Sequence, residues 1–301
     1  MFGFQQLNCS RVPHVAELPP KASAVKGIWG LGRRNYTTGR CSYREFQPLV
    51  SRSMAAEAES DSMGDPIVGI LGGMGPSATA AFYELLIRMT GARNDQEHLH
   101  VVIDSFPQIP DRTEFLLGRG EDPRPAMILG LERLRRAGCA FAVIPCNTAN
   151  VFRVELAENA GLEVVDWIGL ATAAAVDGGK TRVGILATTG TLSSGVYQVA
   201  LGHAGATAIS PNPGEQAVIM SAIYAVKGGH PSAGARDDLG IVAADMIERG
   251  AQSVLLACTE LPLIAPEDDS IWRGIGVDPS AVVARAVIQT ALEWKARSSG
   301  R

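Results

Sequence analysis

Two cysteines in this chain are each preceded by an apolar run and followed by small hydrogen-bonding residues. Cys146 lies in the stretch VIPCNTAN and Cys258 in the stretch VLLACTEL. A thiolate can remove a proton and a thiol can donate one, so two such groups facing one carbon could invert a centre next to a carboxylate. The alternative is that each cysteine is a small core residue, which is the usual place of a free cysteine. Their matching contexts favour acid/base chemistry.

The apolar runs before both cysteines belong to an alternation of strands and helices. The sequence predicts strands at residues 67–71, 100–104, 141–145, 163–166, 182–186, 206–210 and 253–257. Amphipathic helices are predicted at 77–90, 123–137, 148–160, 193–203, 214–226, 235–249 and 279–296. Apolar strands that alternate with such helices are typical of parallel sheets covered on both faces. The predicted fold class is therefore α/β.

The two halves of this pattern resemble each other. The segment VGILGGMG aligns with VGILATTG at an offset that also pairs Phe82 with Tyr197, and a second alignment pairs Cys146 with Cys258. We expect two similar parallel-sheet domains related by pseudo-twofold symmetry. Ligands of open α/β sheets bind beyond the carboxyl ends of the strands, so both thiols should face one cleft between the domains. The expected first domain comprises residues 65–168 plus 279–296, and the expected second domain comprises 169–278.

The residues after Cys146 suit an anion. Asn147, Thr148 and the N–H groups that open the next helix predict a site where the helix dipole favours a thiolate and a substrate carboxylate. Cys139 lacks such neighbours and is predicted to be a core residue.

Composition and charge limit the classes of function. The chain has 301 residues, 46% of them hydrophobic, and a formal charge of −4. Residues 1–54 hold eight Lys or Arg against two acids, so the rest is distinctly acidic and unsuited to nucleic acid. No apolar run is long enough to cross a bilayer. The cysteine spacing fits neither a disulfide framework nor a zinc site, which indicates a reducing compartment.

The Arg-rich start of the chain, poor in acids, predicts a transit peptide within an extension that ends at residue 64. The expected location is an organelle, with the chloroplast favoured over the mitochondrion, and otherwise the cytoplasm. A disordered extension without a targeting role is the alternative.

Six motifs occur in order along the body: GILGGMGP, IPDRT, PCNTA, ATTGT, IYAVKGG and ACTELPL. As an ordered set they resemble the aspartate/glutamate racemase family over residues 66–290. The resemblance implies an amino-acid racemase that needs no cofactor and no metal, acts on a small-molecule amino acid, and forms a homodimer. It makes Cys146 and Cys258 the opposed acid/base pair.

The resemblance also implies substrate-binding residues. Carried over motif by motif, these are Met74, Arg112, Asn147, Thr148, Thr191, Lys227 and Thr259. Arg112 and Lys227 would bind the side-chain carboxylate, which two cations suit. Without the motifs, both would be read as solvated surface charges. Glu260 would orient Thr259 or tune Cys258, or it could accept from a backbone N–H, and Asp111 reads as a cap.

Other functions remain open at this point. The order Gly73-x-Gly75-x-x-Ala78 satisfies a dinucleotide fingerprint, but Pro76 removes an N–H and Asp104 lies too far along. Related folds include other racemases and isomerases of small carboxylates, for which one cysteine or no cationic pocket would be expected. A protein that binds an amino acid without turnover is the non-enzymatic alternative.

Overall fold

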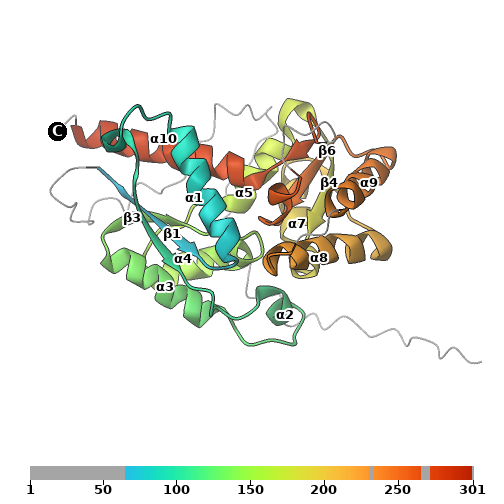
Figure 1. The fold of residues 1–301 in the computed structure, drawn as a ribbon, viewed down its shortest axis with the longest axis horizontal. Helices are drawn as coiled ribbons and strands as arrows, with labels where there is room; N and C mark the ends of the chain where they lie inside the picture. The colour runs from blue at the N-terminus through green and yellow to red at the C-terminus, as the bar shows by residue number, and fades with distance from the viewer. Residues whose placement is uncertain (1–64, 231–233, 266–271, 300–301) are drawn as a thin grey trace, which may run out of the picture. The chain divides into compact units, whose positions relative to one another are not determined.

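The computed structural model describes residues 65–230, 234–265 and 272–299, which lie together in one compact unit of the chain (Figure 1). The predicted transit peptide lies outside the described residues. Among the helices that the structure describes, none has the length and apolar character needed to cross a bilayer.

The first sheet is parallel, with the strand order β2-β1-β3. Its strands are β1 (Ile67–Gly72), β2 (His100–Ser105) and β3 (Cys139–Val143). The elements between and after them are α1 (Pro76–Thr90), η2 (Asp95–Glu97), α2 (Arg112–Leu116), α3 (Arg124–Arg136), η3 (Ala149–Phe152) and α4 (Arg153–Ala160). Every residue of β1 is buried, as expected for a central strand with both faces covered.

The second sheet is also parallel, with the order β5-β4-β6-β7. Its strands are β4 (Arg182–Ala187), β5 (Thr207–Ile209), β6 (Ser253–Ala257) and β7 (Gly276–Val277). The other elements are α5 (Trp167–Ala175), η4 (Asp177–Gly179), α6 (Thr189–Ser194), α7 (Val196–His203), α8 (Pro213–Lys227), α9 (Ala235–Glu248), η5 (Leu261–Leu263) and α10 (Pro279–Ser299).

The two sheets repeat one topology. In each sheet the first strand is central, the second lies on one side and the third on the other. β3 and β6 therefore occupy equivalent places, and these are the strands that lead to Cys146 and Cys258. The prediction of an α/β fold from two similar parallel-sheet halves is confirmed.

Helices α5 and α10 join the two halves. α10 packs against α1, α5 and β6, and α1 and α10 cross each other in Figure 1. One apolar cluster unites Val68 and Ile70 of β1 with Val183 and Ile185 of β4, and it includes much of α5 and α10. The opposite face of each sheet has a core of its own, as the alternation of side chains along a strand requires.

Several elements differ from the sequence prediction, which contains no counterpart of α2, α5 or β7 and expects a strand at residues 163–166. Residues 163–166 form an isolated bridge between Ala142 and Val164 instead of a strand, because the chain turns at once into α5. The Asp166 carboxylate accepts from the Gly169 N–H and so caps that helix. The sequence did not predict α5, because the helix is apolar on most sides and so shows no amphipathic period.

Candidate active site

The loop after β3 holds Cys146 through Asn150. The Asn150 side-chain amide donates to the carbonyl oxygens of Ile144 and Cys146, at 2.9 and 2.8 Å. The Cys146 N–H donates to the Ile144 carbonyl at 2.7 Å. These bonds satisfy the turning backbone, and the Cys146 side chain is left 5% exposed. The thiol therefore sits on a fixed, buried loop.

The loop after β6 pairs Cys258 with a carboxylate. The Cys258 thiol donates to Glu260 Oε2 at 3.0 Å, and the Thr259 hydroxyl donates to the same oxygen at 3.3 Å. Burial and then the Glu260 charge raise the pKa of Cys258 well above its usual value, although Lys227 acts in the opposite direction. Cys258 is therefore a protonated thiol at neutral pH.

A pocket of about 310 Å³ lies beside these loops. It is lined by residues of both halves: Gly73, Met74, Gly75, Pro76, Ser77, Pro107, Ile109, Asp111 and Arg112 from the first, and Val226, Lys227 and Glu260 from the second. The halves come close here, since a Cβ built on Gly75 would lie 3.5 Å from Glu260 Oε1. Four predicted site residues, Met74, Arg112, Lys227 and Glu260, thus line one pocket.

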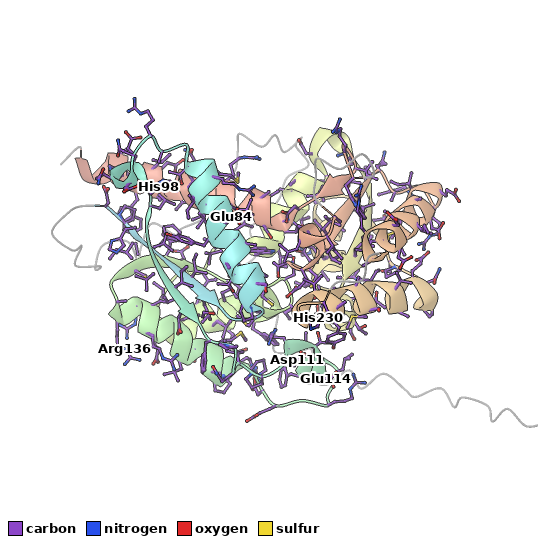
Figure 2. The ribbon with its side chains drawn as sticks, viewed as in Figure 1. Glu84, His98, Asp111, Glu114, Arg136 and His230 are labelled. Carbon is purple, nitrogen blue, oxygen red and sulfur yellow. The ribbon has the colours of Figure 1, made fainter. Side chains whose placement is uncertain are left out.

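Arg112 is placed by the first turn of α2. The Asp111 carboxylate accepts from the N–H groups of Thr113 and Glu114 and caps the helix, and Asp111 and Glu114 are labelled there in Figure 2. This confirms the capping role predicted for Asp111. The guanidinium donates to the carbonyls of Ile109 and Pro110, yet its buried Nε has no acceptor within the described part of the chain. Arg112 is only 8% exposed, so it is not the solvated charge of the alternative reading.

Lys227 is the last residue of α8 and is exposed while lining the pocket. Partial desolvation lowers the pKa of its ammonium, but the charges of Cys258, Glu260 and Cys146 outweigh this and raise it overall. Cys146 and Cys258 lie in loops that follow strands of different sheets. Lys227 stays cationic at neutral pH.

Three threonine hydroxyls join the loops after β3 and β4. Thr148 Oγ1 lies 3.1 Å from Thr188 Oγ1 and 2.8 Å from Thr191 Oγ1, and the last two are 3.0 Å apart. The Thr191 N–H also donates to Thr188 Oγ1, which caps α6. Thr148 and Thr191, predicted as substrate ligands, are thus hydrogen-bonded partners of each other. Thr188 was not predicted, although a Thr between a strand end and the start of a helix is a recognisable N-cap signal.

Asn147 is oriented by hydrogen bonds from two side chains for which the sequence predicts no role. The indole N–H of Trp167 donates to Asn147 Oδ1 at 3.0 Å, and the Tyr197 hydroxyl donates to the same oxygen. Tyr197 occupies the position paired with Phe82 in the first half, so the added hydroxyl was the signal for it. Asn147, Thr148, Thr191, Thr259 and both cysteines are buried and do not line the 310 Å³ pocket.

The glycine-rich turn after β1 does not present its first amide to a ligand. The Gly73 N–H donates to Thr79 Oγ1 at 2.9 Å, and a Cβ on Gly73 would lie 2.4 Å from the Phe106 carbonyl carbon. Gly73 therefore serves close packing within the protein, which weighs against the dinucleotide alternative.

The fold and the pocket define an α/β protein with a pocket of a size suited to a small molecule. The chain belongs to the Asp/Glu/hydantoin racemase family, whose model matches residues 71–287, and racemases are isomerases. A broad specificity amino-acid racemase, RacX, of Bacillus subtilis (strain 168) is 28% identical over 237 residues, which cover 76% of this chain and 100% of that protein.

Solved structures agree with this assignment. Picrophilus torridus aspartate racemase is 32% identical, with a TM-score of 0.67, over 75% of this chain and 94% of that one. A putative Asp/Glu racemase from Yersinia pestis has a TM-score of 0.63 at 20% identity, over 75% and 99% of the respective chains, and supports the fold alone.

Proposed function

We propose that this protein racemises an acidic amino acid, aspartate or glutamate, without an organic cofactor. One of Cys146 and Cys258 removes the Cα proton, and the other donates its own proton to the opposite face of Cα. The observation that most supports this is the placement of Cys146 and Cys258 after equivalent strands of two similar sheets, beside loops whose residues line one pocket. The two thiols stand at the ends of equivalent strands, and residues from both halves line that pocket.

The proposed first step uses the protonation state of Cys258. Because Cys258 donates to Glu260, it carries the proton, and Cys146 as thiolate takes the proton from Cα. The Cα–H bond breaks, its electrons pass to the substrate carboxylate, and a Cys146 S–H bond forms. The Cys258 S–H bond then breaks as its proton joins the opposite face of Cα. Cys146 is left protonated and Cys258 as the thiolate, which is the state that runs the reaction backwards.

The acidic substrate is inferred from the cations of the pocket. Arg112 is nearly buried and has an N–H to spare within the described residues, and Lys227 adds a second positive charge. A side-chain carboxylate between them would satisfy the Arg112 donor and offset both charges. The Glu260 charge lies at the Cys258 side of the pocket and would accept from the substrate ammonium.

The alternative is a broader range of amino acids, which the name of the Bacillus subtilis relative suggests. In that case Arg112 and Lys227 would serve the α-carboxylate or solvent, and substrates without a second carboxylate would react equally well.

Chiral chromatography tests the proposal. L-Aspartate, D-aspartate, both enantiomers of glutamate and L-alanine are each incubated with the protein, without pyridoxal phosphate. The proposal predicts conversion of at least one acidic amino acid in both directions, much faster than alanine. Equal conversion of alanine would support the broad-specificity alternative, and no conversion of any of them would refute racemisation.

A further inference from the structure

The orientation of the Asn147 side chain is set by its two donors. An indole N–H can only donate, so the Asn147 atom 3.0 Å from Trp167 Nε1 must be the amide oxygen. The Tyr197 hydroxyl donates to the same oxygen. A carbonyl oxygen has two lone pairs, so these two donors use its accepting capacity.

The amide nitrogen is left with two N–H donors. Asn147 is 2% exposed, and its Nδ2 has no acceptor in the part of the chain that the structure describes. A buried donor without a partner is costly, so such a group in a native site calls for a partner such as a ligand, a water molecule or an ion. Asn147 directly follows Cys146, and both residues are buried in the loop after β3. The amide therefore lies beside one of the two proposed proton carriers.

We propose that Tyr197 and Trp167 are positioning residues that hold the Asn147 side chain in one orientation. In that orientation its amide N–H groups donate to the α-carboxylate of the substrate, and its oxygen is not available to the substrate. This rests on the proposed function and narrows it. An Asn side chain that was free to turn could accept from the substrate ammonium through its oxygen, and the bonds from Trp167 and Tyr197 prevent this. A donor at the α-carboxylate also gains strength as negative charge moves there from Cα, which stabilises the transition state.

The hydroxyl of Tyr197 suits this role over a wide pH range. Tyr197 is 1% exposed, and burial first, with the charges of Asp166, Cys258 and Cys146, raises its pKa well above the usual value. It therefore remains protonated, and a donor, at neutral pH. Trp167 is fully buried and packs on Phe82 with ring centroids 5.7 Å apart, which fixes its indole N–H.

The variant Tyr197→Phe tests the role of the hydrogen bond to Asn147, because it removes the hydroxyl oxygen and keeps the ring. Calorimetry measures the binding of L-aspartate and of succinate, which has the carboxylates but no ammonium. Loss of one bond that orients a carboxylate donor should weaken both ligands by roughly 3- to 10-fold. Tyr83→Phe, at a tyrosine that is 37% exposed and lines no part of the pocket, is the matched control and should bind both normally.

A double variant shows whether Tyr197 acts through Asn147. In an Asn147→Ala background the loss of the Tyr197 hydroxyl should change binding by less than about twofold, since no amide is left to orient. An undiminished effect in that background would overturn the proposal. So would a loss of aspartate binding alone, which would mean that Asn147 accepts from the ammonium, or no loss of either ligand.

Asn147→Asp covers the case in which Tyr197→Phe fails to fold. It keeps an acceptor for Trp167 and Tyr197 but replaces the donor N–H groups by a negative charge, so it should fold and lose both ligands. Retained succinate binding by this variant would contradict the proposal. Cα–H exchange of aspartate in D₂O, measured in the wild type, separates the two hypotheses. Binding without exchange would refute racemisation but not the positioning role of Tyr197 and Trp167. The absence of both binding and exchange would refute both hypotheses.

Discussion

The hydrogen bond from Cys258 to Glu260 predicts that the variant Glu260→Gln makes Cys258 more reactive. Glu260 is 3% exposed and its Oε2 lies 3.0 Å from the sulfur, so its charge opposes a thiolate in a poorly hydrated place. Gln keeps the size of Glu, removes the charge and can donate an N–H to the thiolate. The substitution therefore lowers the pKa of Cys258.

The magnitude follows from the loss of one charged hydrogen bond. Such a bond contributes about 1.5–3 kcal/mol, and about 1.4 kcal/mol is a factor of ten in a proton equilibrium. The thiolate fraction at a fixed pH near 8 should rise by roughly 10- to 100-fold. A less basic thiolate is also a weaker nucleophile, with a Brønsted slope of about 0.4–0.5, so the observed alkylation rate should rise by only about 4- to 15-fold.

Iodoacetamide labelling followed by peptide mass spectrometry measures this rate at Cys258 alone. Glu114→Gln is the matched control, because Glu114 pairs with Arg119 at the surface and should leave the rate unchanged. A folded Glu260→Gln protein whose Cys258 reacts at the wild-type rate, or more slowly, would refute the assigned hydrogen bond and its charge effect.

Three further predictions concern other residues. Thr188→Val should lower the free energy of unfolding, measured by urea titration, by about 1–2 kcal/mol, because Thr188 caps α6 and bonds to two hydroxyls. Thr188→Ser keeps the hydroxyl and is the control, with near-native stability expected. An unchanged free energy of unfolding in Thr188→Val would contradict this. Burial raises the pKa of Cys139 to about 11, so the unfolded chain releases this proton at lower pH than the folded protein does. The melting temperature should therefore fall between about pH 9 and pH 11, and it should fall less steeply in Cys139→Ala. An identical pH dependence of the melting temperature in the two proteins would contradict this. Arg112→Gln should weaken aspartate binding by about tenfold or more in calorimetry and leave alanine binding unchanged; an equal loss for alanine would remove its role at the side-chain carboxylate.

The sequence predicted the scaffold well because the strands carry their own signal. The apolar runs that became β1, β4 and β6 are buried along most of their length, and turn residues bound them. Both cysteines were therefore expected at equivalent strand ends, where the structure has them. Matching segments such as VGILGGMG and VGILATTG reflect the repeated strand order of the two sheets.

The partners of the site residues could not be predicted in the same way. The bonds that fix Asn147 come from Trp167 and Tyr197, which lie 20 and 50 residues further along and meet it only through tertiary packing. Thr148 likewise bonds to Thr188 and Thr191 across the two halves. Periodicity and local spacing carry no information on such long-range pairs, so substrate contacts inferred from motifs for Thr148 and Thr191 stay predictions.

The exchange of Cα–H for deuterium by two single-cysteine variants tests the central proposal most directly. Each of Cys146→Ser and Cys258→Ser loses one of the two proton carriers, so neither should racemise aspartate or glutamate. Each should still exchange the Cα proton of one enantiomer in D₂O, and the two variants should act on opposite enantiomers. Racemisation at the wild-type rate by either variant, or exchange of the same enantiomer by both, would contradict a mechanism with one cysteine on each face of Cα.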